Sequence, residues 1–135
     1  MLNKKKFDCK SLGFIAKQLK RLGYTAEYCK GLGFTAQELK KVDYTAGKLL
    51  NAGYTLKELK DAGYTPIHLQ FAGCILRDLK NVGYTASELN DSGFTIRELK
   101  DAGYSLRDLI DIGYTAKELN DSGFTTWGIK GDLNV

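Results

Sequence analysis

Hydrophobic and polar positions recur along this chain with a period of ten residues. In the stretch Gly113-Tyr-Thr-Ala-Lys-Glu-Leu-Asn-Asp-Ser-Gly123, one ring and one leucine are separated by short runs of polar and small residues. The ring position is aromatic in every repeat from 14 to 124 except at Cys74, and the Gly before it is missing only at Asp43. The repeats follow one another without insertion from 13 to 125.

Each repeat carries the start and stop signals of one short helix. Thr115 is placed to act as an N-cap, and Glu118 stands at N3, where its carboxylate can accept from the N-cap backbone N–H in a capping box. The pattern predicts a helix over 116–122, ending at Gly123 with a left-handed backbone. Pro66 after Thr65 fits the first helical position, and Asp43 is a residue that tolerates the left-handed conformation.

The ring between two helices is expected to contact both of them. A residue before the N-cap packs on the fourth helical residue, and a residue after a Schellman ending packs back on the third-last one. Tyr114 is thus expected to touch Leu109 behind it and Leu119 ahead. The ring and leucine columns need no catalytic explanation.

Helices of about two turns are too short to be stable alone, because isolated helices need ~12 residues to be marginally stable. The sequence therefore predicts an all-α repeat solenoid, a superhelical spiral with three or four short helices per turn. The near-identity of 83–95 and 113–125, thirty residues apart, favours three, although a duplication explains it equally well. We expect one domain over 1–135, with an N-terminal cap at 1–12, repeats at 13–125 and a C-terminal cap and tail at 126–135.

This pattern resembles the decapeptide arrays of the Gly-[Tyr/Phe]-Thr-Ala-x-Glu-Leu-Lys-x-Ala type. The resemblance covers residues 13–125 and implies a helical repeat fold, but no activity. Some residues depart from this repeat pattern, and individual properties of this chain are expected at those positions. The departing residues are Tyr28, Asp43, Gly47, Lys48, His68, Phe71, Cys74 and Trp127.

Composition is that of an ordinary soluble chain, 43% hydrophobic and 27% charged. No apolar run approaches the ~20 residues of a membrane span, and the lysine-rich start lacks the apolar segment of a secretory signal, so an intracellular, cytoplasmic protein is expected. Cys9 and Cys29 occupy the leucine column and are expected to be buried apolar fillers. With one histidine and no Cys-x-x-Cys spacing, neither a zinc site nor another cofactor is predicted.

The residues that could act in catalysis all have structural explanations, so the sequence predicts neither an enzyme nor a small-molecule substrate. The glutamates at 38, 58, 88, 98 and 118 all stand at N3, where capping and the helix dipole explain them. His68 stands at the same position without a recognisable nucleophile. The glycines are spaced by ten rather than clustered in a phosphate-binding loop.

Charge is distributed unevenly along the chain. Residues 1–60 hold 13 Lys or Arg against five acids, net +8, and residues 61–135 hold seven against eleven, net −4. Three interpretations remain open: a solvated surface, head-to-tail association of copies, or a ladder of lysines that binds the phosphates of nucleic acid or of an anionic surface. The ladder consists of Lys10, Lys20, Lys30, Lys40 and Lys60.

A second local feature is an apolar pair, Ile67 and Phe71, on the helix face that is charged in other repeats. Neighbours at i and i+4 share one face, so the pair is either a contact surface for a partner or another copy, or a spot that the array covers. Together these features predict a non-enzymatic scaffold or protein-interaction module, a protein partner or homo-oligomer, and as the alternative a binder of nucleic acid or anionic surfaces.

Overall fold

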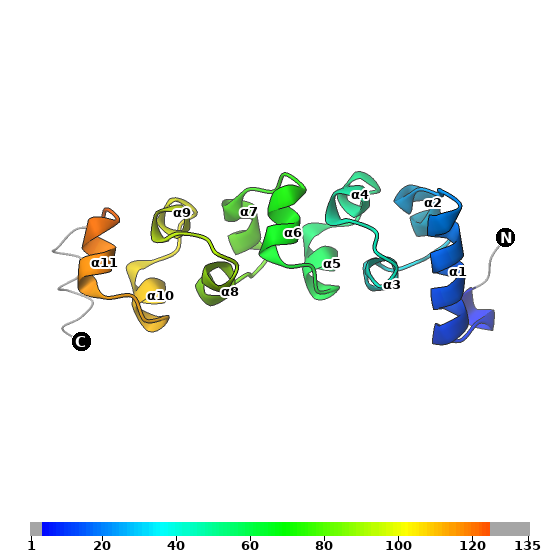
Figure 1. Cartoon of the computed structure of the whole chain (residues 1–135), viewed down its shortest axis with the longest axis horizontal. Helices are drawn as coiled ribbons and strands as arrows, with labels where there is room; N and C mark the ends of the chain where they lie inside the picture. Colours follow the sequence, from blue (N-terminus) through cyan, green and yellow to red (C-terminus); the bar gives the residue numbers. More distant parts are fainter. Residues whose placement is uncertain (1–3, 125–135) are drawn as a thin grey trace. The chain divides into compact units, whose positions relative to one another are not determined.

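A computed structural model describes residues 4–124 of the chain, and all regular structure over that range is helical. A short 3-10 helix at Lys4–Lys6 precedes a series of α-helices that begin about every ten residues (Figure 1). This confirms the predicted all-α repeat fold. The helices are α1 (Cys9–Arg21), α2 (Ala26–Gly31), α3 (Ala36–Lys40), α4 (Ala46–Asn51), α5 (Leu56–Asp61), α6 (Pro66–Phe71), α7 (Leu76–Asn81), α8 (Ala86–Asp91), α9 (Ile96–Asp101), α10 (Leu106–Asp111) and α11 (Ala116–Asp121).

The helix ends have the predicted hydrogen bonds. In α11 the Glu118 backbone N–H donates to Thr115 Oγ1 at 3.2 Å, and the Thr115 N–H donates to the Glu118 carboxylate at 2.8 Å, which completes a capping box. At the other end the Phe124 N–H donates to the Leu119 carbonyl and the Gly123 N–H to the Asn120 carbonyl, both at 3.1 Å. These two bonds form a Schellman motif.

Backbone dihedral angles explain which residue types occupy the turns. Gly123 has φ +100°, and Asp43, which replaces Gly in its repeat, has φ +69°. Asp is among the few residues with a side chain that tolerate this region. Pro66 begins α6 at the position where its missing N–H costs no hydrogen bond.

The first helix differs from the prediction. α1 runs for 13 residues straight through Gly13, although a break was expected there. Ile15 stands where other repeats have the capping Thr, and Phe14 is 64% exposed, so neither a cap nor a packed ring favours a new helix start. Instead Asp8 caps α1 by accepting from the Ser11 N–H at 2.7 Å, a bond that lowers the pKa of the Asp8 carboxyl.

Contacts within the chain group into two compact units, residues 1–73 (unit 1) and 74–135 (unit 2). The division falls where Cys74 replaces the ring and Ile75 replaces the capping Thr. The continuous single domain over 1–135 stays a prediction. The predicted C-terminal cap and tail, with Trp127, lie outside the described residues.

In unit 1, each helix contacts its second neighbour along the chain. The pairs α1 and α3, α2 and α4, α3 and α5, and α4 and α6 lie side by side, so that even-numbered and odd-numbered helices form two rows (Figure 1). Contacts therefore recur at every second repeat of the sequence. The contacts in this unit have a two-helix period, because tyrosine side chains reach across to the second repeat before their own. The number of three or four helices per superhelical turn stays a prediction.

Tyrosine hydroxyls make this second-neighbour contact specific. Tyr44 donates to the Tyr24 carbonyl at 2.8 Å, Tyr64 to the Tyr44 carbonyl at 2.5 Å, and Tyr54 to the Phe34 carbonyl. Burial raises the pKa of Tyr54 and of Tyr64 to about 12. A buried carbonyl left unpaired would cost about 1–3 kcal/mol, so each hydroxyl satisfies a costly acceptor.

Unit 2 repeats the tyrosine hydrogen bond at the same spacing along the chain. Tyr104 donates to the Tyr84 carbonyl at 2.5 Å, again two repeats earlier, and burial raises the pKa of Tyr104 to about 12. The Lys100 ammonium donates to the Gly123 carbonyl at 2.9 Å and so satisfies a turn that follows α11.

The core is a column of leucines at one position of the repeat. The leucines at 39, 49, 59, 69, 79, 89, 99, 109 and 119 have no exposed surface. Cys29 fills the same column and is fully buried, as predicted, but Cys9 is exposed. The prediction for Cys9 is wrong because it lies in the first turn of α1, at the end of unit 1.

The weakest helix start in unit 2 offers a stability test. Ile75 at the N-cap of α7 is 61% exposed and makes no side-chain cap. Ile75→Thr is expected to raise the free energy of unfolding by about 1 kcal/mol, because a hydroxyl would accept from the Asp78 N–H. Ile75→Val, which has the shape of Thr without the hydroxyl, is the control in urea denaturation. Equal stability of the two variants would contradict this assignment.

Over residues 4–124, no helix has both the length and the apolar character needed to cross a membrane.

Candidate functional site

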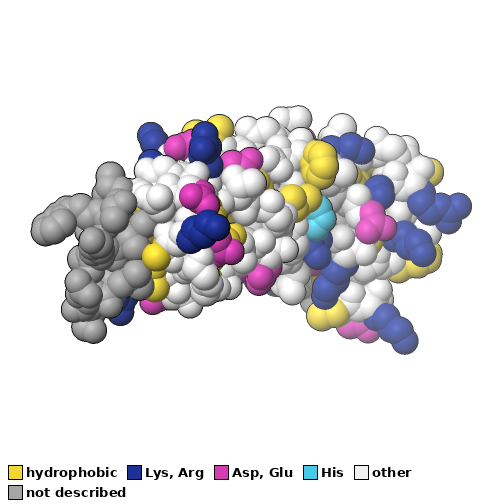
Figure 2. Space-filling model, turned by 60° about the vertical axis from the view of Figure 1, so that its left-hand side comes forward, with side chains coloured by type: hydrophobic (Ala, Val, Ile, Leu, Met, Phe, Trp, Pro, Cys, Tyr) yellow, Lys and Arg dark blue, Asp and Glu magenta, His cyan; other side chains and the backbone are white. Residues whose placement is uncertain are grey.

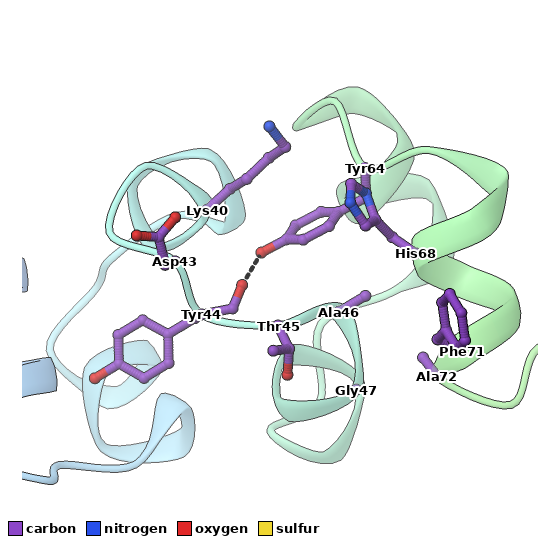
Figure 3. A pocket seen from close by; sticks show the side chains of 10 residues that line it. All are labelled: Lys40, Asp43, Tyr44, Thr45, Ala46, Gly47, Tyr64, His68, Phe71 and Ala72. Atoms are coloured by element: carbon purple, nitrogen blue, oxygen red, sulfur yellow. Dashed lines mark hydrogen bonds between the residues drawn. The ribbon is translucent and has the colours of Figure 1, made fainter.

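Several departures from the repeat meet in one cavity of unit 1. The cavity has a volume of about 510 Å³ and opens between the α3–α4 turn, α4 and α6 (Figure 3). Asp43, Gly47, His68 and Phe71, four of the departures, line it together. The remaining lining residues belong to the regular pattern and are Lys40, Tyr44, Thr45, Ala46, Tyr64 and Ala72.

Gly47 and Phe71 give this cavity its shape. Most other repeats carry a longer side chain at the position of Gly47, for example Glu27, Gln37 or Lys57. A Cβ added at Gly47 would lie 3.8 Å from the Ala72 Cβ, so longer groups would extend over the opening. Phe71 replaces an otherwise mostly polar position and is 87% exposed. The result is an open site with both polar and apolar lining residues beside an exposed ring.

His68 is held in place by the helix start it caps. The Thr65 N–H donates to His68 Nδ1 at 3.1 Å, and the His68 N–H donates back to Thr65 Oγ1 at 3.4 Å. Because Nδ1 accepts, the neutral ring carries its proton on Nε2. The imidazole meets the Tyr64 ring edge to face, with centroids 5.8 Å apart.

Tyr64 and Lys40 also line the cavity, and they contact each other. The Tyr64 hydroxyl donates to the backbone carbonyl of Tyr44, as the dashed line in Figure 3 shows. The Lys40 ammonium lies 5.8 Å from the Tyr64 ring centroid, within the range of a cation–π contact. The cavity lining thus includes the Lys40 cation packed against the Tyr64 ring, whose hydroxyl is held by a hydrogen bond.

An equivalent cavity lies two repeats earlier, between α2 and α4. It has a volume of about 390 Å³, and its ten lining residues each precede a residue of the α4–α6 cavity by 20 positions. Tyr44 lines both cavities. Here Glu27, Lys48 and Asn51 stand where the larger cavity has Gly47, His68 and Phe71.

Two ladder lysines pack over rings that lie further along the chain. The ammonium groups of Lys30 and Lys40 lie 5.6 and 5.8 Å from the ring centroids of Tyr54 and Tyr64. Unit 2 repeats this contact with Lys80 over Tyr104 at 5.7 Å. The recurrence of lysine at this position therefore has a structural explanation in the fold.

The other members of the ladder are placed differently. Lys10 is exposed on α1, and Lys4 takes the place over the Phe34 ring at 5.2 Å, where it also donates to the Gly33 carbonyl at 2.6 Å. Because α1 continues through Gly13, the lysine over the ring at this end of unit 1 is Lys4 and not Lys10. Lys20 is half-buried beside the α2–α4 cavity, and Lys60 is half-buried on α5.

Only one member of the predicted apolar pair on α6 lines the cavity, and the role of the pair as a contact surface stays a prediction. Phe71 is exposed and lines the cavity, whereas Ile67 is half-buried and does not. Phe71 instead shares its site with Gly47 and His68, which the sequence marked only as separate departures. Their convergence was not predicted, because it depends on the two-helix period that brings 47 beside 71.

Over the described part of the chain, no group of three or more His, Cys, Asp or Glu side chains is placed to hold a metal ion. The cysteines at 9, 29 and 74 are free thiols. Burial raises the pKa of the Cys74 thiol, and Cys29 Sγ lies 3.5 Å from the Tyr44 hydroxyl. These thiols lie outside the lining of the cavity.

Comparison with known proteins gives one family. The model of the family described as "Decapeptide repeat region" matches residues 6–76 and 73–130. No curated protein and no solved structure matches the chain.

Proposed function

The chain belongs to the decapeptide repeat family, and we propose that it is a non-enzymatic scaffold whose unit 1 binds another protein. The binding site is the α4–α6 cavity, and the occupant is an acidic polypeptide segment that inserts a large apolar side chain beside Phe71. The observation that carries this proposal is the meeting of Asp43, Gly47, His68 and Phe71 in one cavity of an otherwise regular array.

Exposure of Phe71 supports a protein partner. A ring that is 87% exposed loses the hydrophobic free energy that burial would provide, on the order of 1.5–3 kcal/mol for a large apolar side chain. Aromatic residues are enriched at the centres of protein interfaces. Tyr44 and Tyr64 line the same cavity, but their rings are almost fully buried, so Phe71 supplies most of its exposed aromatic surface.

Charge supports an acidic partner. Residues 1–73 hold 13 Lys or Arg and six Asp or Glu, a net charge of +7, whereas residues 74–135 carry −3. Figure 2 shows dark blue Lys and Arg side chains gathered over the part of unit 1 at the right of the view. Complementary charge accelerates encounter and disfavours basic partners.

Two features of the cavity support a role without catalysis. His68 Nδ1 accepts the Thr65 N–H, and the Tyr64 hydroxyl donates to a carbonyl. Burial raises the pKa of Tyr64 to about 12, which places its titration far from neutral pH. A general acid or base works best with a pKa near the operating pH.

Binding of nucleic acid or an anionic surface is the alternative function, and it has less support. Lys30 and Lys40 lie over rings, and those rings are themselves packed between helices. Single-stranded nucleic acid is usually bound by rings free to stack on bases.

The proposal can be tested by selecting displayed random peptides on the full chain. We expect acidic peptides with one large apolar residue, and we expect Phe71→Asn and Gly47→Lys, which restore residue types of other repeats, to weaken their binding about 10-fold. Asp61→Asn, at the repeat position of Phe71 but on α5, is the matched control. Thermal unfolding should show that all variants fold.

Each other outcome has a defined meaning. Peptides that bind Phe71→Asn and wild type equally would overturn the site, and selection of no peptide would overturn protein binding through unit 1. Retention of DNA or RNA at low salt, lost at high salt, would favour the alternative. A mass by light scattering that increases with concentration at low salt and falls at high salt would favour head-to-tail association of copies over a separate partner.

A further inference from the structure

We infer that the partner segment is extended and carries two apolar side chains three residues apart, one for the α2–α4 cavity and one for the α4–α6 cavity. This inference rests on the proposed function and specifies the ligand of the same surface. It follows from the repetition of the cavity, the spacing of the helices and the charge around both openings.

The two cavities are copies of one site. Their lining residues correspond position by position at an offset of 20, and Tyr44 belongs to both. α2, α4 and α6 lie side by side in one row, since α4 contacts the other two. A ligand that runs along this row therefore meets the α2–α4 cavity and then the α4–α6 cavity.

Helix spacing sets the distance between the two anchors. Packed helices lie about 8–10 Å apart, so the cavities are separated by about one such step. A polyproline II segment rises about 3.1 Å per residue with three residues per turn, which places side chains i and i+3 on the same face about 9 Å apart. Spacings of two or four residues change both the distance and the face.

The cavities differ in size, and this predicts different anchors. The α4–α6 cavity of about 510 Å³ has Gly47 where the α2–α4 cavity of about 390 Å³ has Glu27. We assign a ring to the larger site and a branched aliphatic side chain to the smaller one, where Glu27 takes up part of the space that Gly47 leaves open. Near the smaller site Tyr24 and Tyr28 offer two partly exposed rings, with centroids 4.7 Å apart.

Charge at the openings selects acidic residues between the anchors. Lys20 and Lys48 line the smaller cavity and Lys40 lines the larger one. Glu27 and Asp43 are the acids on the same two linings, so cations are in excess. The net charge of +7 for residues 1–73 acts in the same direction.

Fluorescence anisotropy with synthetic peptides tests the spacing. The probes are labelled peptides of Glu, Ser and Pro that contain one Phe and one Val at separations of two, three or four residues, in both orders, and a peptide with Phe alone. We expect the three-residue separation, in one order, to bind about 10-fold tighter than the others, because only it buries the Val side chain as well.

Variants of the two cavities test the size difference. Gly47→Lys should abolish the advantage of the three-residue separation, and Glu27→Ala should strengthen binding of a peptide with Phe at both anchor positions. Binding of the peptide with Phe alone as tight as that of the peptides at every separation would overturn the two-cavity inference and leave the proposed function standing. Absence of binding by every peptide, including that with Phe alone, would overturn both.

Discussion

Leu59→Ala is expected to lower the free energy of unfolding of unit 1 by about 2–5 kcal/mol. Leu59 lies in the middle of α5 and has no exposed surface. Removing its side chain loses the transfer free energy of the buried atoms and leaves a cavity in the leucine column. A helix of six residues has no stability of its own to offset that loss. Urea denaturation followed by circular dichroism measures the effect.

Leu56→Ala in the same helix is the matched control. Leu56 is half-buried and stands where most repeats have Ala. The same chemical change should therefore cost only about 1 kcal/mol at this position. The contribution of helix propensity to stability cancels in this comparison, since both variants replace Leu by Ala in α5. If the two variants were equally stable, the leucine column would not be the core of this fold.

Raising the pH from 10 to 12 is expected to unfold the protein through its tyrosines. Burial raises the pKa of Tyr54, Tyr64 and Tyr104 to about 12, from 10.0 in the unfolded chain, and raises the pKa of Tyr44 as well. The stabilisation is complete below pH 10, where both states are protonated. It is lost as the pH rises to the folded-state pKa, because only the unfolded state ionises readily. The loss is on the order of 1–3 kcal/mol per tyrosine.

Single Phe variants isolate the tyrosine contribution. Tyr54→Phe in unit 1 and Tyr104→Phe in unit 2 should each lower stability by about 1 kcal/mol at pH 7, since a carbonyl loses its donor. Each should also flatten the decline of stability between pH 10 and 12 by up to about 1.4 kcal/mol per pH unit. Lysines titrate in the same range, and both variants retain all of them. An unchanged slope would show that the hydroxyls are not buried donors.

Local structure could be predicted from the sequence because its causes lie within one repeat. A capping Thr, a carboxylate three residues later and a Gly after the last turn act over a few residues, and the bonds at Thr115, Glu118 and Gly123 have the predicted form. The same reasoning placed Pro66 and the left-handed Asp43. It failed at Gly13, where α1 continues because the cap and the packed ring are both missing.

The candidate site could be predicted only in part. Comparison with the repeat pattern marked His68, Phe71 and Gly47 as departures, but nothing within one repeat indicates that they line a common cavity. The excess of Tyr over Phe in the ring column was the available signal for a hydroxyl bond, since Phe fills a core equally well. The carbonyl that accepts the bond lies two repeats earlier, as between Tyr64 and Tyr44.

The sequence by itself determined that this protein is a series of short, individually capped helices with one leucine column inside. Its caps and turns are bonds between residues at most five positions apart, so they form wherever the pattern occurs. Only the tertiary structure decided that second-neighbour helices pack together. That packing sets which turn carbonyls the Tyr hydroxyls reach, and it brings Gly47 beside Phe71 to open the cavity.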